Sequence, residues 1–173
     1  AGLLMASSET YETLALSSSP DAPGVLEVAI NRPDSLNAFN GLFWVEMKRC
    51  MEAASDDPEV RCVVLHGGSC RLFTSGLDLK EEMSGGSGGT LGIGAAATTK
   101  ADVSRRALRM EAGIRIAQDG ISSVERCRKP VVVAMHSGVI GGGVDLVCAC
   151  DIRYCSEDTF FSIAEVNVGL TAD

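Results

Sequence analysis

The sequence has no excess of basic residues and no apolar run long enough to cross a membrane. Its 173 residues include 15 lysines and arginines against 23 aspartates and glutamates, which gives a formal net charge of −8. Nucleic acids and anionic membranes bind basic surfaces, and a membrane-spanning helix needs roughly 20 apolar residues in a row. The sequence therefore argues against generic nucleic-acid binding and against a membrane span. A local basic patch for one phosphorylated ligand remains compatible with it.

The sequence also lacks a regular cysteine framework. It has seven cysteines, an odd number, and Cys62, Cys148 and Cys150 lie in apolar runs, where free cysteine packs as a small hydrophobic residue. We therefore expect a reducing, intracellular compartment and no structural disulfides. A zinc site made from His136 and nearby cysteines would lack paired ligand spacing, so no metal site is predicted.

The N-terminus has no basic region of the kind that opens a secretory signal. We expect residues 1–8 to be an N-terminal tail, partly foreign to the natural chain, with Met5 as the natural start. Residues 9–173 are enough for one core domain. The composition, with 46% hydrophobic and 22% charged residues, is typical of a globular protein.

Turn residues and hydrophobic periodicity predict alternating strands and helices. Strands are expected at 9–15, 24–30, 61–66 and 131–135, and helices at 40–55, capped by Asn40, at 101–126, and from about Gly142, followed by two short strands. The glycine-rich segment 84–99 predicts a flexible loop.

Each of the two long helices is expected to bury one apolar stripe. In the first helix the stripe consists of Leu42, Val45, Met51 and Ala54. In the second it consists of Val103, Leu108, Ile114, Ala117, Ile121 and Val124. Gly113 and Gly120 are expected to weaken the second helix, because glycine is a poor helix former.

The segment from residue 130 to the end carries the strongest chemical signal. A β-branched run followed by glycines and an apolar segment predicts a strand, a tight turn and a helix. The helix N-terminus presents free N–H groups and the positive end of a dipole, which suits a developing anion. Three acids follow among apolar residues, namely Asp145, Glu165 and Asp173. Amide donors beside several carboxylates are what proton abstraction next to a carbonyl requires.

The glycine run does not fit a nucleotide-binding loop. The spacing from Gly138 to Gly143 matches a Walker loop, but Val144 stands where that loop needs lysine. A dinucleotide fingerprint that began at Gly141 would need glycine where Leu146 stands. Both nucleotide-binding interpretations are therefore rejected.

Two motifs resemble those of the crotonase (enoyl-CoA hydratase/isomerase) superfamily. One is HSGVIGGGVD at 136–145 with CDIRY at 150–154, and the other is FTSGLDL at 73–79. The resemblance extends from about Tyr11 to the last residue. It implies an α/β fold, a spiral of repeated ββα units that lacks the family's C-terminal helical region here, and a homotrimer or homohexamer.

Within the superfamily the acids are most similar to those of Δ3,5-Δ2,4-dienoyl-CoA isomerases. Those enzymes carry aspartate after the GGG run, glutamate twenty residues later and aspartate eight beyond, which corresponds to Asp145, Glu165 and Asp173. The resemblance implies that Glu165 and Asp173 form the acid/base pair, in either order, with Asp145 as a supporting acid. Such an enzyme converts 3,5-dienoyl-CoA to 2,4-dienoyl-CoA in fatty-acid β-oxidation, in a peroxisome-like organelle or a mitochondrion.

The resemblance also implies a site for the acyl-CoA thioester. The backbone N–H groups of Leu77 and Gly142 would form an oxyanion hole. The residues implied to contact substrate or coenzyme A are Arg32, Asn37, Ala38, Gly76, Leu77, Asp78, Leu79, Lys80, Gly142 and Gly143. No separate cofactor is implied, because coenzyme A is part of the substrate.

Several alternatives stay open at this point. The protein could be an enoyl-CoA hydratase, although those enzymes usually have two glutamates and Asp145 is one methylene shorter. It could also be a non-catalytic crotonase-fold binding protein, against which the acidic net charge and the intact acids count. Arg32 could be a solvated loop cation. His66 and His136 each end a strand and could be catalytic bases, but a structural role is preferred.

Overall fold

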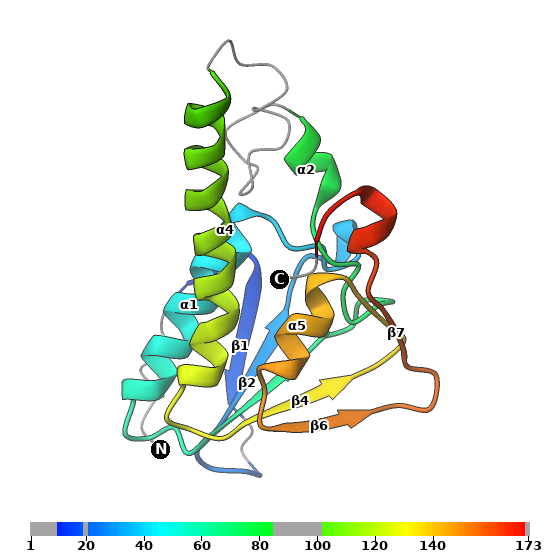
Figure 1. Ribbon diagram of the computed structural model, residues 1–173. Helices are drawn as coiled ribbons and strands as arrows, with labels where there is room; N and C mark the ends of the chain where they lie inside the picture. Colours follow the sequence, from blue (N-terminus) through cyan, green and yellow to red (C-terminus); the bar gives the residue numbers. More distant parts are fainter. Residues whose placement is uncertain (1–9, 19–20, 85–101, 172–173) are drawn as a thin grey trace.

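The computed structural model describes residues 10–18, 21–84 and 102–171, and it contains two sheets packed with helices (Figure 1). The larger sheet has the strand order β1–β2–β3–β4–β6. Its strands are β1 Leu14–Ser18, β2 Val25–Ile30, β3 Cys62–His66, β4 Val131–Met135 and β6 Ile152–Cys155. Strand β1 is antiparallel to β2, and the other neighbours are parallel. Strands β5 (Gly138–Ile140) and β7 (Phe160–Ser162) form a second, parallel sheet.

The helices follow the strands in the order that the resemblance implies. They are α1 Gly41–Asp56, α2 Leu79–Met83, α4 Val103–Arg126 and α5 Gly142–Cys148, with short 3₁₀ turns η2 Pro33–Ser35 and η3 Glu165–Val168. The units β1–β2–α1 and β4–β5–α5 are each a ββα repeat. The side chain of Asn40 accepts the Phe43 N–H at 3.0 Å, which confirms the predicted cap of α1.

The core lies between the larger sheet and the paired helices α1 and α4, which run side by side along one flank (Figure 1). Alternate residues of β2, β3 and β4 face it, as the half-buried strand pattern predicts. Phe39 and Phe43 stack with ring centroids 4.1 Å apart, and Trp44 meets both rings edge-on. Each such side chain contributes about 1.5–3 kcal/mol of burial free energy.

The predicted stripes of the long helices are partly wrong. Leu42 and Val45 in α1, and Val103 and Leu108 in α4, are exposed. The buried face of α1 consists of Phe43, Trp44, Glu46, Met47, Cys50, Met51 and Ala54. This face is wider than an apolar stripe because α1 packs against both the sheet and α4, and Glu46 is buried through hydrogen bonds.

That glutamate also explains why the first strand begins later than predicted. The Glu46 carboxylate accepts the Glu12 and Thr13 N–H groups at 2.9 and 2.8 Å, and the Thr13 hydroxyl as well. The N–H groups of Glu12 and Thr13 are therefore bound to α1, although the Thr13 carbonyl still accepts the Asn31 N–H just beyond β2 at 2.8 Å. The strand runs from 14 to 18, where 9–15 was expected.

The glycines of α4 do not interrupt it, contrary to the expected weakening. Gly113 and Gly120 are both buried in a continuous helix. A Cβ at Gly120 would lie 2.9 Å from the Trp44 carbonyl oxygen, so the missing side chain lets α4 approach α1 closely.

Three further expectations concern the chain as a whole. None of the seven cysteines, all of which lie in the described ranges, forms a disulfide, as predicted. Within the described ranges no helix is both long enough and apolar enough to cross a membrane. The predicted flexible loop at 84–99 lies outside the described residues from position 85 onward.

Candidate functional site

Two turns that are far apart in sequence meet at the site. Thr74 forms a parallel bridge with Val139, and a Cβ at Gly76 would lie 2.8 Å from the Ile140 carbonyl oxygen. Gly76 has φ +83° and Gly141 has φ +55°, the left-handed region that side chains disfavour. Glycine at these two positions therefore lets the loop before α2 contact the turn before α5.

Two hydrogen bonds to Phe39 orient the first turn so that the Leu77 N–H points away from the core. The Gly76 carbonyl accepts the Phe39 N–H at 2.7 Å, and the Asp78 N–H donates to the Phe39 carbonyl at 2.9 Å. In a planar trans peptide the C=O and the following N–H point in opposite directions. The Leu77 N–H therefore points away from Phe39, and it finds no acceptor among the described residues.

The second amide comes from the start of α5. Gly142 is the first residue of that helix, so its N–H is one of the helix's unsatisfied donors. The preceding Gly141 carbonyl accepts the Val144 N–H at 2.7 Å, which turns the Gly142 N–H outward. Leu77 and Gly142 both line the same cavity. The structure thus brings the two predicted residues together, while their role as an oxyanion hole stays a prediction.

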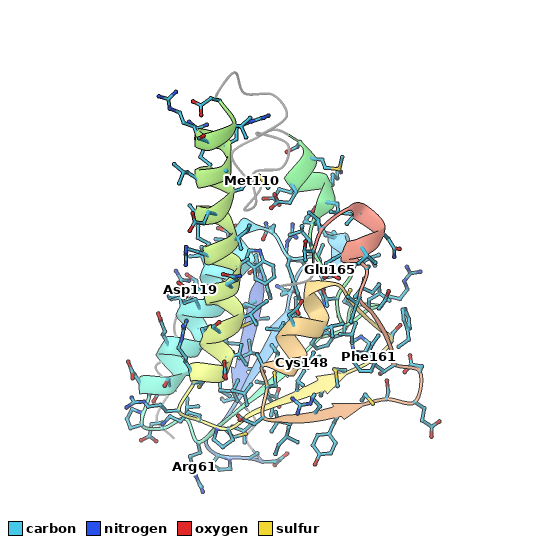
Figure 2. All side chains as sticks on the ribbon, in the orientation of Figure 1. Arg61, Met110, Asp119, Cys148, Phe161 and Glu165 are labelled. Carbon is cyan, nitrogen blue, oxygen red and sulfur yellow. The ribbon has the colours of Figure 1, made fainter. Side chains whose placement is uncertain are left out.

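This cavity has a volume of about 370 Å³. One wall is an apolar face of α4, made by Met110, Ile114, Ala117 and Ile121. The opposite side carries Gly142, Asp145, Glu165 and the segment 169–171. Figure 2 shows Met110 on α4 and Glu165 at the start of η3. A cavity with an apolar wall and a few convergent polar groups is the usual form of a small-molecule site.

Glu165 is the most distinctive side chain of the cavity. Its Oε2 atom is buried and has no hydrogen-bond partner among the described residues. Its Oε1 atom lies 3.1 Å from where a Cβ on Gly141 would stand, so the carboxylate rests against the turn that carries Gly142. An unpaired buried polar atom costs about 1–3 kcal/mol or more. A buried carboxylate oxygen that is left unpaired within the protein is suited to contact a ligand.

Of the other two predicted acids, the structure describes Asp145 but not Asp173. Asp145 lies in the first turn of α5 and is half-buried, as its apolar neighbours predicted. Its Oδ2 atom is 4.0 Å from where a Cβ on Gly142 would stand, and the residue lines the cavity. Asp173 lies outside the described residues. Thr171, two positions earlier, lines the cavity.

The side chains of Arg32 and Asn37 are already engaged within the protein. The Arg32 guanidinium lies 2.9 Å from Asp78 and 3.7 Å from Glu81, and it also donates to the Ala38 carbonyl. Asn37 is fully buried, and its Nδ2 donates to the carbonyls of Gly67 and Phe73 at 2.9 and 3.1 Å. These bonds support the loop that carries Leu77. Contacts from Arg32, Asn37 or Ala38 to coenzyme A stay a prediction.

The remaining predicted contact residues fall into two kinds. Asp78 caps α2 by accepting the Glu81 N–H at 3.1 Å, and Leu79 and Lys80 are exposed in the first turn of that helix. Gly143 is buried, and a Cβ there would lie 2.3 Å from the Thr74 methyl carbon, Cγ2. Gly143 is therefore a packing position, and Lys80 is the residue of this set with an exposed charge.

Sequence reasoning missed Trp44 and Thr74. Trp44 lines the cavity although only 3% of it is exposed, and its Nε1 has no partner among the described residues. Thr74 is fully buried and hydrogen-bonds across the first turn. A polar residue between the apolar Phe73 and a glycine turn was the available signal for Thr74. His136, whose Nε2 lies 2.8 Å from the Cys70 carbonyl oxygen, has the structural role that was preferred for it.

Comparison with known proteins agrees with this architecture. The enoyl-CoA hydratase/isomerase family model matches residues 21–173. The chain is 42% identical over 164 residues to the mitochondrial Δ(3,5)-Δ(2,4)-dienoyl-CoA isomerase of Homo sapiens, covering 95% of this chain and 46% of the human protein. It is 38% identical over 165 residues to the peroxisomal Δ(3,5)-Δ(2,4)-dienoyl-CoA isomerase of Arabidopsis thaliana, covering 95% of this chain and 56% of that protein.

Solved structures share the fold. A crystal structure from Thermobifida fusca YX, described as an enoyl-CoA hydratase in complex with acetoacetyl-CoA, superposes with a TM-score of 0.74 at 25% identity. The match covers 98% of this chain and 59% of that one. The chain thus spans about half the length of the curated relatives, between 46% and 56% for the two named above. The predicted fold, the spiral of ββα units, is confirmed, and the chain belongs to the enoyl-CoA hydratase/isomerase family.

Proposed function

We propose that the protein is a dienoyl-CoA isomerase, which converts 3,5-dienoyl-CoA to 2,4-dienoyl-CoA. The observation that carries the proposal is a buried carboxylate oxygen of Glu165 that has no hydrogen-bond partner among the described residues, in the cavity that Leu77 and Gly142 also line. Further support comes from the names of the human and Arabidopsis relatives. The mitochondrial or peroxisomal location in those names, and an assembly of three or six subunits, belong to the same proposal.

The first step needs a stabilised enolate. The thioester carbonyl oxygen would accept hydrogen bonds from the Leu77 and Gly142 N–H groups. Donors fixed in advance stabilise the charge that develops on this oxygen, and loss of one donor typically lowers the rate by about 10²–10³. The helix N-terminus of α5 adds its positive dipole end at the same point.

The second step moves protons at two distant carbons. A carboxylate removes a C2 proton, the negative charge delocalises along the diene, and an acid protonates C6. C2 and C6 are four bonds apart, so a single carboxylate would hardly reach both. Glu165 and Asp173 are therefore assigned as the pair, in either order. Asp145, which borders the same cavity, is the supporting acid.

The acyl chain needs an apolar surface next to the reacting carbons. The α4 wall of Met110, Ile114, Ala117 and Ile121 supports this position for it. The exposed Lys80 in α2 is the cation on which a phosphate of coenzyme A would be expected to bind.

The test follows the ultraviolet absorbance when 3,5-octadienoyl-CoA is added. Product formation brings the diene into conjugation with the thioester carbonyl. This raises the absorbance at the longer wavelength at which the conjugated dienoyl thioester absorbs. Glu165→Gln keeps the shape and removes the proton acceptor, so we expect kcat to fall by roughly 10²–10⁴. Acyl-CoA affinity should stay nearly unchanged, as measured by the fluorescence of Trp44, the sole tryptophan, which lines the cavity.

Glu59→Gln, a change at an exposed glutamate outside the cavity, is the matched control and should leave turnover unchanged. Constant absorbance with the dienoyl substrate, together with hydration of a 2-enoyl-CoA, would replace the isomerase with a hydratase. Full turnover by Glu165→Gln would remove that residue from the mechanism.

A further inference from the structure

One fully buried residue, Thr74, contacts both of the turns that carry the two amides. Its hydroxyl oxygen accepts the Gly76 N–H at 3.0 Å, and its O–H donates to the Asn37 carbonyl at 2.7 Å. The Gly76 N–H is thus held in place, and the next peptide group along the chain carries the Leu77 N–H. The hydroxyl therefore fixes the backbone immediately before the first amide.

The rest of Thr74 reaches the second turn. Its methyl carbon lies 2.3 Å from where a Cβ on Gly143 would stand, so it packs directly on the residue after Gly142. Its backbone N–H donates to the Gly138 carbonyl at 3.1 Å, and its carbonyl accepts the Ile140 N–H at 3.3 Å. One side chain thus holds the first turn with its hydroxyl and spaces the second turn with its methyl group.

The support behind Thr74 is itself rigid. Asn37, whose carbonyl accepts the Thr74 hydroxyl, is fully buried with φ +55°. Its side chain is tied to the carbonyls of Gly67 and Phe73 and accepts the Arg32 N–H at 3.0 Å. Because the single hydroxyl hydrogen of Thr74 is committed to Asn37, an oxygen lone pair is oriented toward the Gly76 N–H.

We propose that Thr74 is the positioning residue that sets the distance and orientation between the Leu77 and Gly142 amides. The inference rests on the proposed oxyanion hole. It adds a residue that touches no substrate and acts through both turns. Removal of the hydroxyl leaves a buried Gly76 N–H without its acceptor, and that peptide then relaxes and misaligns Leu77. Removal of the methyl leaves α5 free to settle toward position 74.

Two variants separate these effects. Thr74→Val keeps the shape and loses the hydroxyl, and Thr74→Ser keeps the hydroxyl and loses the methyl. We expect Thr74→Val to lower kcat by about tenfold to a hundredfold, less than full loss of one donor, with KM nearly unchanged. Thr74→Ser should lower kcat by only a few-fold, because both hydroxyl bonds remain.

The decisive readout is the infrared carbonyl frequency of bound hexanoyl-CoA that carries ¹³C at the thioester carbonyl. Hydrogen bonds to the carbonyl lower this frequency relative to free ligand in water. We expect a downshift with the unmodified protein, part of it lost in Thr74→Val and a smaller part lost in Thr74→Ser. Thr13→Val is the matched control, because it also removes a buried threonine hydroxyl bond, here to Glu46, away from the cavity.

The outcomes separate the inference from the function on which it rests. No downshift in the unmodified protein would overturn the oxyanion hole itself. A full downshift that Thr74→Val retains, even with lower stability like that of Thr13→Val, would overturn the role of Thr74. If Thr74→Val does not fold, Thr74→Ser tests the spacing role of the methyl group, which the proposal also requires. Unchanged kcat and frequency in that variant would reject the spacing role, and a partial loss of both would support it.

Discussion

Replacing Gly143 with alanine tests how tightly the two turns of the site are packed. A Cβ at this position would lie 2.3 Å from the Thr74 methyl carbon, whereas carbon atoms in contact stand about 3.5–4.0 Å apart. Overpacking of a filled interior costs about 1–3 kcal/mol. The better helix propensity of alanine recovers at most about 1 kcal/mol. Gly143→Ala is therefore expected to lower the free energy of unfolding by up to about 3 kcal/mol, which is the packing cost less the gain in helix propensity.

The Thr74→Ser background should accept that alanine. With the methyl removed, the nearest neighbours of the new Cβ are Val139 Cγ1 at 3.5 Å and Thr74 Cβ at 3.8 Å, which are ordinary contacts. The two substitutions are therefore expected to couple favourably by about 1–3 kcal/mol. Urea unfolding followed by the fluorescence of the sole tryptophan, Trp44, yields the four free energies of the cycle. Additivity within about 0.5 kcal/mol would refute the close contact.

Three further predictions concern the support of the site. Asn37→Ala should lower the free energy of unfolding by about 3 kcal/mol or more, because it leaves several buried hydrogen-bonding groups without partners and puts alanine at φ +55°. Urea unfolding measures this loss, and a loss below about 1 kcal/mol would contradict the prediction. Gly120→Ala should cost about 1–3 kcal/mol despite better helix propensity, since its Cβ would lie 2.9 Å from the Trp44 carbonyl oxygen; a stabilised variant would show that α4 does not approach α1 this closely. Burial lowers the pKa of His66 in the folded protein, so the unfolded chain binds the proton more tightly. The free energy of unfolding should therefore decrease as the pH falls through the unfolded pKa of about 6.5 toward the lower folded pKa. Urea unfolding from pH 7.5 to 5.0 should show a shallower decline for His66→Gln than for the unmodified protein, and parallel curves would contradict this.

Local chemistry was enough to predict the central part of the site. The glycine run, the β-branched strand before it and the cap at Asn40 are all short-range signals, because they depend on backbone conformations that few residues allow. The other loop of the site, which carries Gly76 and Leu77, was implied by the FTSGLDL motif and its resemblance. That these turns meet across more than sixty positions was implied by the resemblance and could not follow from the residues alone, since it depends on the strand order of the sheet.

The errors arose where tertiary packing decides the role of a residue. Leu42 and Val45 fit an apolar stripe by sequence, yet the helix turns Phe43 and Trp44 inward because α4 packs on that side. Gly120 was interpreted as a weakness of the helix, although it is the contact point between two helices. A periodic pattern shows that a helix has a buried face, but the width and direction of that face depend on its neighbours.

The location of the buried polar atoms that have no hydrogen-bond partner distinguishes the candidate site from the rest of the core. Among the described residues, two buried side-chain polar atoms have no hydrogen-bond partner, Trp44 Nε1 and Glu165 Oε2. Folded proteins pair most such atoms, because each unpaired one is destabilising. The rest of the described chain follows this rule, as Glu46 and Asn37 show with several bonds each. Both exceptions belong to residues that line a single cavity, beside Gly142. Stability alone gives no reason for that coincidence, whereas a site whose polar groups are kept for a ligand does.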